Sequence, residues 1–191
     1  INGESERVKN LYGIGSGQTD DFGRQCLMAR RFAEAGVRFV EVCHNNNWDA
    51  HGGLSTRVPQ LCSQIDRPMA GLLADLKQRG MLEDTLVVWG GEFGRTIYSQ
   101  GTLTKDNYGR DHHPRCFTVL LAGASVRKGV IHGETDDYSY NIVRDPVHVH
   151  DLNATILHLM GLNHTRLTYR SQGRDFSRTD IHGELSKPVL A

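Results

Sequence analysis

The chain has 191 residues, 38% of them hydrophobic, and its 22 lysines and arginines are balanced by 22 aspartates and glutamates. This length is typical of one domain, and the apolar content excludes an intrinsically disordered chain. The zero net charge and the lack of a Lys/Arg run argue against a nucleic-acid partner or an acidic membrane surface, because both require a positive field. Every apolar run is far shorter than the roughly 20 residues of a membrane span, so we expect none.

The first half of the chain predicts a helix, a strand and a second helix. Apolar positions three to four residues apart indicate a helix from Thr19 or Asp20 to Gly36. Residues 37–43 alternate and are β-branched, which predicts a buried strand, and a polar loop follows over 44–53. A long apolar face then predicts a helix from about residue 59 to 79.

The second half predicts further strands and one helix. The expected elements are a buried strand at 85–89, a long polar stretch at 96–114, a strand at 116–122, a short strand at 130–133, a helix at 151–160 and an irregular tail at 162–191. Alternating strands and helices predict an α/β fold, a mostly parallel sheet flanked by helices in a single domain over 1–191.

Polar side chains gather where the predicted strands end or begin. Ligands of parallel sheets bind beyond the carboxyl ends of the strands. The residues found there are His44, Asp49 and His51 after the first strand, Glu92 and Arg95 after the second, and Arg110, Asp111, His112 and His113 before the third. Because carboxylates and imidazoles are the ligands of divalent ions such as zinc, the sequence predicts a metal site.

Each of these residues also has a structural interpretation. Asp49 could be a turn former, Glu92 could be the partner of Arg95, and 112–114 could be an ordinary loop, although Pro114 restrains the backbone before it. The two imidazoles of 148–150 share one face of a strand, but a polar cap is expected before the helix at 151 in any case.

Other motifs that carry chemistry are missing or weak. There is no G-x-S-x-G, P-loop, H-E-x-x-H or G-x-G-x-x-G motif, so lipase-like, nucleoside-triphosphatase, zincin and Rossmann functions lack their signatures. His158 lies among leucines, which favours a partly buried structural side chain. The four cysteines form no C-x-x-C pair, so we expect buried thiols rather than a zinc finger or a redox motif.

Five segments of the chain carry a further signal, namely 48–51 (WDAH), 89–96 (WGGEFGRT), 109–114 (GRDHHP), 151–161 (DLNATILHLMG) and 166–176 (RLTYRSQGRDF). Together they resemble the sulfatase-like family numbered 1501 among domains of unknown function. The resemblance covers nearly the whole chain. It implies membership of the alkaline phosphatase superfamily, whose strand-helix core holds a two-metal site that cleaves phosphate or sulfate esters.

The resemblance also assigns residues, with departures. Asp49 and His51 match the Asp and His that bind one metal, although fewer residues separate them than usual. Glu92 matches the start of an adjacent Asp-His pair, whose second ligand is replaced by phenylalanine here. His112 or His113 matches a further ligand. The nucleophile and first Asp belong to the amino-terminal half of these longer, exported bacterial proteins, so the chain resembles the carboxyl-terminal half and we expect little turnover from it alone.

The predicted function is therefore metal-dependent hydrolysis of a small-molecule phosphate or sulfate ester, with one or two zinc ions. Arg95 and Arg110 would neutralise charge on the substrate oxygens. The alternative is a non-catalytic module that binds a carbohydrate or an anion, for which the expected aromatic face consists of Trp48, Trp89, Tyr98 and Tyr108. An isomerase or phosphomutase is a third interpretation. Apolar surface left where the other half docks would favour self-association, and the resemblance implies a periplasmic location.

Overall fold

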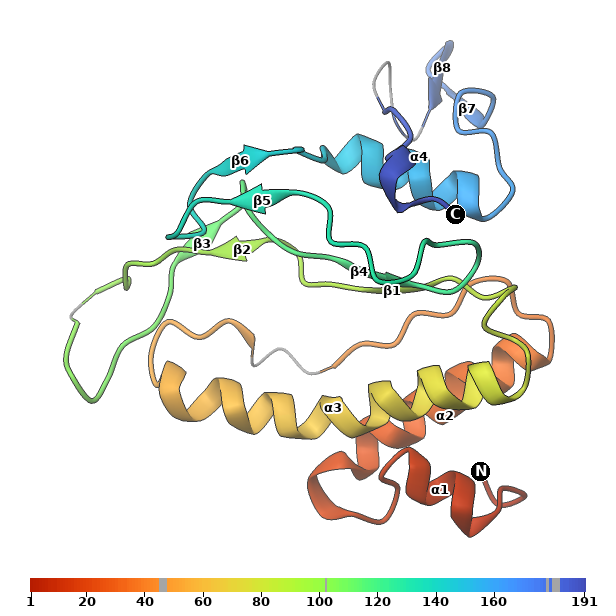
Figure 1. Cartoon of the computed structure of the whole chain (residues 1–191), viewed down its shortest axis with the longest axis horizontal. Helices are drawn as coiled ribbons and strands as arrows, with labels where there is room; N and C mark the ends of the chain where they lie inside the picture. Colours follow the sequence, from red (N-terminus) through yellow and green to blue (C-terminus); the bar gives the residue numbers. More distant parts are fainter. Residues whose placement is uncertain (45–47, 102, 178, 180–182) are drawn as a thin grey trace. The chain divides into compact units, whose positions relative to one another are not determined.

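The structure is a computed structural model that describes residues 1–44, 48–101, 103–177, 179 and 183–191 (Figure 1). The chain divides into two units, Ile1–Thr85 with Arg95–His112, and Leu86–Gly94 with His113–Ala191. A single domain over 1–191 stays a prediction, and residues 45–47 of the predicted polar loop are outside the described residues.

The first unit is built on helices. They are α1 (Glu6–Leu11), the 3₁₀ helix η1 (Gly17–Thr19), α2 (Asp20–Glu34) and α3 (Leu54–Gln78). The predicted helix at 19–36 is confirmed by α2, whose first turn carries two aspartates that favour a helix N-terminus. The α3 helix starts earlier than predicted, directly after Gly53 in the left-handed conformation (φ 62°), and it continues through two prolines. No described helix has the length and hydropathy to cross a bilayer.

The core of this unit lies between α2, α3 and the segment after α1. It contains the buried residues Tyr12, Ile14, Phe22, Cys26, Leu27 and Ile65. Two helical glycines permit the close packing, since a Cβ at Gly23 would lie 2.3 Å from the Tyr12 carbonyl oxygen and one at Gly71 would lie 2.6 Å from that of Leu11. A larger side chain would push Tyr12 away from α2 at the first position and the end of α1 away from α3 at the second.

A buried ion network ties α2 to α3. The Arg30 side chain is 2% exposed, and its nitrogens lie 2.6 Å from Glu4 Oε1, 2.6 Å from Glu34 Oε2 and 3.0 Å from Asp75 Oδ2. The Tyr12 hydroxyl donates to Asp75 Oδ2 at 2.9 Å, and burial together with this carboxylate raises the tyrosine pKa. The guanidinium is thus surrounded by three carboxylates, as a buried charge requires.

The predicted parallel sheet is wrong. The strands instead form two-stranded pairs, which are β1 (Val87–Trp89) with β4 (Leu120–Ala122), β2 (Gly94–Arg95) with β3 (His112–His113), β5 (Glu134–Thr135) with β6 (Ile142–Arg144), and β7 (Thr168–Ser171) with β8 (Arg174–Ser177). The pairs β1–β4, β5–β6 and β7–β8 are antiparallel. No described helix separates parallel strands of one sheet.

The segments with strand composition are more exposed in the structure than a buried parallel sheet requires. The segment 37–43 has the composition of a strand, but it is described without a ladder partner, and Phe39 is 73% exposed. The strand predicted at 85–89 contains β1, yet Val88 and Trp89 are 45% and 42% exposed rather than buried. Alternation and β-branching show that a segment can be extended, whereas the partner and its direction depend on tertiary packing.

The second unit combines β-pairs with one helix, α4 (Val149–Leu159). His148 caps this helix: its Nδ1 accepts from the His150 N–H at 3.2 Å, and its own N–H donates to Asp151 Oδ2 at 3.0 Å. The cap interpretation of 148–150 therefore fits the structure. The strand predicted at 130–133 is not formed, and β5 begins at the next residue, Glu134. The tail predicted to be irregular contains the β7–β8 hairpin, whose turn residues Gln172 and Gly173 have positive φ.

The cysteines give a test of this packing. Cys26 is 2% exposed, and burial raises its pKa to about 12, whereas Cys43 is exposed. We expect a thiol reagent to label Cys43 at least about tenfold faster than Cys26, because the thiolate reacts and burial suppresses it. Peptide mapping by mass spectrometry after brief labelling checks this order. Equal labelling of Cys26 in the native chain would contradict the described core.

Candidate metal centre

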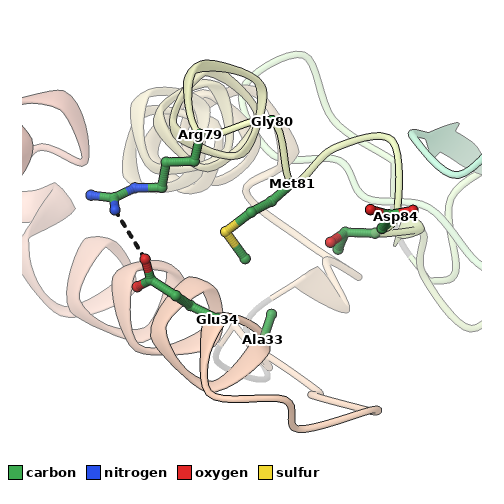
Figure 2. Close-up of a pocket in the computed structure, with 7 residues that line it drawn as sticks. Ala33, Glu34, Arg79, Gly80, Met81 and Asp84 are labelled. Atoms are coloured by element: carbon green, nitrogen blue, oxygen red, sulfur yellow. Dashed lines mark hydrogen bonds and ion pairs between the residues drawn. The ribbon is translucent and has the colours of Figure 1, made fainter.

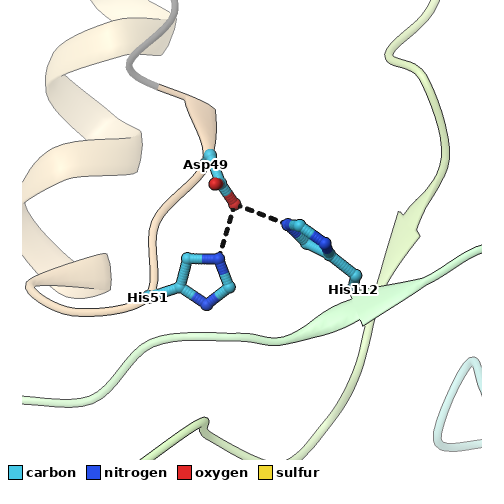
Figure 3. Close-up of side chains that lie close together, drawn as sticks. All are labelled: Asp49, His51 and His112. Carbon is cyan, nitrogen blue, oxygen red and sulfur yellow. Dashed lines mark hydrogen bonds and ion pairs between the residues drawn. The ribbon is translucent and has the colours of Figure 1, made fainter.

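Three potential metal ligands converge in the first unit. Asp49, His51 and His112 each place one ligand atom within 4.8 Å of the others (Figure 3). Oδ1 of Asp49 lies 2.9 Å from Nε2 of His51 and 3.0 Å from Nε2 of His112. We call these three residues the ligand cluster. All three side chains are partly exposed, so a ligand from solution can reach them.

Backbone pairing between two distant loops holds one side of the ligand cluster. The Arg110 N–H donates to the Ala50 carbonyl at 3.0 Å, and the Leu54 N–H donates to the Tyr108 carbonyl at 3.0 Å. The Gly53 N–H donates to Asn107 Oδ1 at 2.8 Å. Since Gly53 also precedes α3, the loop that carries Asp49 and His51 is attached to the start of a long helix.

Gly109 allows the two loops to meet. A Cβ at this position would lie 2.1 Å from the carbonyl carbon of His51 and 2.3 Å from its oxygen. Atoms never approach that closely, and the obstacle is backbone rather than a side chain that can rotate. The absence of a side chain at Gly109 is therefore a requirement of this arrangement.

Thr96 organises the strands on the other side. This residue is 2% exposed; its N–H donates to the Asp111 carbonyl, and its Oγ1 accepts from the Asp111 N–H, both at 2.9 Å. The hydroxyl also donates to the Tyr98 carbonyl at 2.6 Å. These bonds fix the residues next to Arg95 and His112, which are otherwise in strands of two residues.

The surrounding positive groups keep Asp49 ionised. The hydrogen bond from His112, with the charges of His51 and Arg95, holds its pKa below the ordinary value, although partial desolvation opposes this. These interactions stabilise the fold at neutral pH and are lost as the pH falls through the lowered pKa. A carboxylate only accepts hydrogen bonds, so Nε2 of each histidine carries a proton in this arrangement.

The ligand cluster fits a divalent transition metal in donor type and spacing. Two imidazole nitrogens and one carboxylate oxygen match the donor sets of zinc, which leave a position open for substrate. Ligand atoms around tetrahedral zinc lie about 3.3 Å apart, so contacts of 2.9 and 3.0 Å need to open only slightly. His51 Nδ1 is buried and has no hydrogen-bond partner in the described part of the chain, so only Nε2 faces the cluster.

Two predicted ligands, Glu92 and His113, belong to the second unit. Glu92 is exposed there. His113 is 5% exposed; its Nε2–H donates to the Tyr140 carbonyl at 2.7 Å, and its ring stacks on that of Tyr140 at 4.4 Å. Successive residues of a strand point to opposite faces. This alternation explains why His112, rather than its neighbour, lies beside Asp49.

The predicted arginines differ in their contacts. Arg95 Nη1 lies 2.8 Å from Asp49 Oδ1, next to the ligand cluster. The Arg110 side chain donates to the Ile97 carbonyl. Trp48, one of the four aromatic residues expected for sugar binding, donates from Nε1 to His44 Nδ1 at 2.9 Å and packs against the helical core.

A separate hollow of about 550 Å³ lies at the ends of α2 and α3 in the same unit (Figure 2). Glu34 and Arg79 line it and form an ion pair of 3.1 Å between Oε1 and Nη1. Arg30 contacts the other oxygen of Glu34. The carboxylate in this hollow is therefore neutralised by two arginines of the buried network.

Comparison with known proteins identifies the family. A family model described as "Protein of unknown function (DUF1501)" matches residues 1–190. The chain belongs to the DUF1501 family. This confirms the family resemblance of the five sequence segments, while the relation to sulfatases and alkaline phosphatases stays a prediction. No curated protein and no solved structure matches this DUF1501 chain.

Proposed function

We propose that this DUF1501 chain binds a divalent metal ion, zinc by its donor set, and serves in the hydrolysis of phosphate or sulfate esters. The observation that carries the proposal is the convergence of Asp49, His51 and His112, from two loops far apart in the sequence, on one point. The sulfatase-like resemblance of the sequence supports the ester class of substrate. Periplasmic location remains part of that resemblance.

Each residue has a distinct task in this proposal. The carboxylate and the two imidazoles would hold the ion, which would supply Lewis-acid polarisation of an ester oxygen. Arg95, at 2.8 Å from Asp49, brings a permanent positive charge to the same place. A guanidinium binds the oxygens of phosphate and sulfate through two parallel hydrogen bonds. Arg110, two residues before His112, would supply a second charge after leaving the Ile97 carbonyl.

Zinc binding is the direct test. We expect one zinc ion per chain in a calorimetric titration, and at least about tenfold weaker binding after Asp49→Asn or His112→Ala, because each removes a ligand. His113→Ala is the matched control. It removes the neighbouring imidazole, which is bonded to Tyr140, and it should leave the zinc affinity of the folded protein unchanged.

The outcomes separate the metal site from the reaction. Equal loss in His112→Ala and His113→Ala would contradict the ligand cluster, and so would zinc binding that survives Asp49→Asn. We expect little turnover of aryl phosphate and aryl sulfate esters by the zinc-loaded chain alone, and hydrolysis at ordinary enzymatic rates would contradict the expectation that its site is incomplete. Ester turnover that survives both removal of zinc by a chelator and Asp49→Asn would show that the reaction takes place elsewhere.

A further inference from the structure

One oxygen of Asp49 is contacted by three nitrogens. Nη1 of Arg95, Nε2 of His51 and Nε2 of His112 lie 2.8, 2.9 and 3.0 Å from Oδ1. A carboxylate oxygen has about two lone-pair directions. The three donors therefore already fill the coordination of the atom that a metal ion would use.

Unlike the two histidines, Arg95 cannot act as a metal ligand. A neutral imidazole can turn from a hydrogen-bond donor into a metal ligand by presenting a nitrogen lone pair, whereas a guanidinium keeps its protons and has no acceptor. The two histidines beside Asp49 are therefore compatible with a bound cation, whereas the guanidinium of Arg95 is not.

The distances make the conflict concrete. An ion bound to Oδ1 at about 2.1 Å would lie at most about 4.9 Å from Arg95 Nη1, given the 2.8 Å contact of that nitrogen with the same oxygen. A divalent ion and a guanidinium at this separation repel each other, and the protein surface screens the repulsion only in part. Metal binding must therefore weaken the contact between Arg95 and Asp49.

We propose that Arg95 competes with the metal ion for Asp49 and that, once displaced, it binds an oxyanion of the substrate. The inference rests on the proposed metal site and adds an order of events to it. Without metal, Arg95 neutralises the Asp49 carboxylate. With metal, the guanidinium turns to a phosphate or sulfate oxygen, which its planar fork fits. Thermodynamic linkage then requires that the metal and the anion each tighten the binding of the other.

The test is a zinc titration at one fixed pH, with and without inorganic sulfate. In the absence of sulfate, Arg95→Met should bind zinc about three- to tenfold more tightly than the unaltered chain, because a repelling charge and a competing donor are removed. Sulfate should tighten zinc binding to the unaltered chain and have a clearly smaller effect on Arg95→Met, in which Arg110 is the remaining charge proposed for the anion. Arg95→Gln, a second neutral replacement, should behave in the same way.

Arg110→Met is the matched control, since it removes the same charge two residues from His112 while the Arg110 side chain donates to the Ile97 carbonyl. Its zinc affinity should change less than that of Arg95→Met. Circular dichroism of each sample establishes folding. If both Arg95 variants bind zinc no more tightly than Arg110→Met, Arg95 is no competitor, although the metal site stands. If sulfate tightens zinc binding equally in the unaltered chain and in the Arg95 variants, the proposal that the displaced Arg95 binds the substrate's oxyanion is wrong.

Failure of the proposed function gives a different result. In that case the unaltered chain binds zinc no better than Asp49→Asn, whatever stands at position 95. The competition would then be overturned together with the site.

Discussion

Arg30→Met should destabilise the protein by about 3–5 kcal/mol, the cost of breaking a buried ion network by removing one partner. Methionine has a similar length, but it leaves Glu4 and Asp75 without the central cation that lies 2.6 and 3.0 Å from them. Asp75 is itself 3% exposed, so water can hardly replace the lost contact. Urea unfolding followed by circular dichroism measures the change.

Arg24→Met is the control for this prediction, because Arg24 forms an exposed ion pair with Asp20 at 2.8 Å on the same helix. Its effect should be much smaller, since exposed pairs contribute little. The double variant Arg30→Met/Asp75→Asn should lose less than the sum of the single losses, as expected of residues in one network. Similar stability of Arg30→Met and Arg24→Met would show that the network contributes little.

Gly109→Ala should destabilise the first unit by about 1–3 kcal/mol, as overpacking of a fixed site does, and should also weaken zinc binding at least about tenfold, since small displacements of ligands are costly. The added methyl group would lie 2.1 Å from the His51 carbonyl carbon. Relief requires that the two loops separate, which would carry His51 away from His112. Thermal unfolding and zinc titration measure the two effects.

Gly3→Ala provides the comparison, because a Cβ at Gly3 meets nothing within 4 Å and the φ angle there is not positive. We expect its melting temperature and zinc affinity to match those of the unaltered chain. A Gly109→Ala protein that keeps its zinc affinity would show that the ligand cluster does not depend on the close approach of the two loops.

The helices could be predicted from the sequence, and the sheet could not. Apolar spacing and the terminal glycines located α2, most of α3 and most of α4, because helical hydrogen bonds and caps are local. The strands predicted at 85–89 and 116–122 contain β1 and β4, yet these pair antiparallel with each other. The segment 37–43 has a strand pattern and no described ladder. Pairing depends on distant residues, which local patterns do not encode.

The types of residue in the ligand cluster could be predicted from the sequence, but which of the candidates converge could not. Asp49, His51 and His112 were all candidates, since carboxylates and imidazoles in loops are recognisable. The choice between His112 and His113 depended on β3, a strand of two residues that no periodicity could reveal. Thr96 and Gly109 were missed, although a glycine directly before an Arg-Asp-His-His run was a signal of close backbone approach.

The two sides of the ligand cluster are attached to elements of very different length. Gly53 joins the loop of Asp49 and His51 to α3, a helix of 25 residues, whereas His112 lies in a strand of two. A long helix resists bending, and a short strand pair with few hydrogen bonds is more compliant. Ions of different radius would therefore be accommodated chiefly by movement of His112, with Asp49 and His51 as the fixed reference.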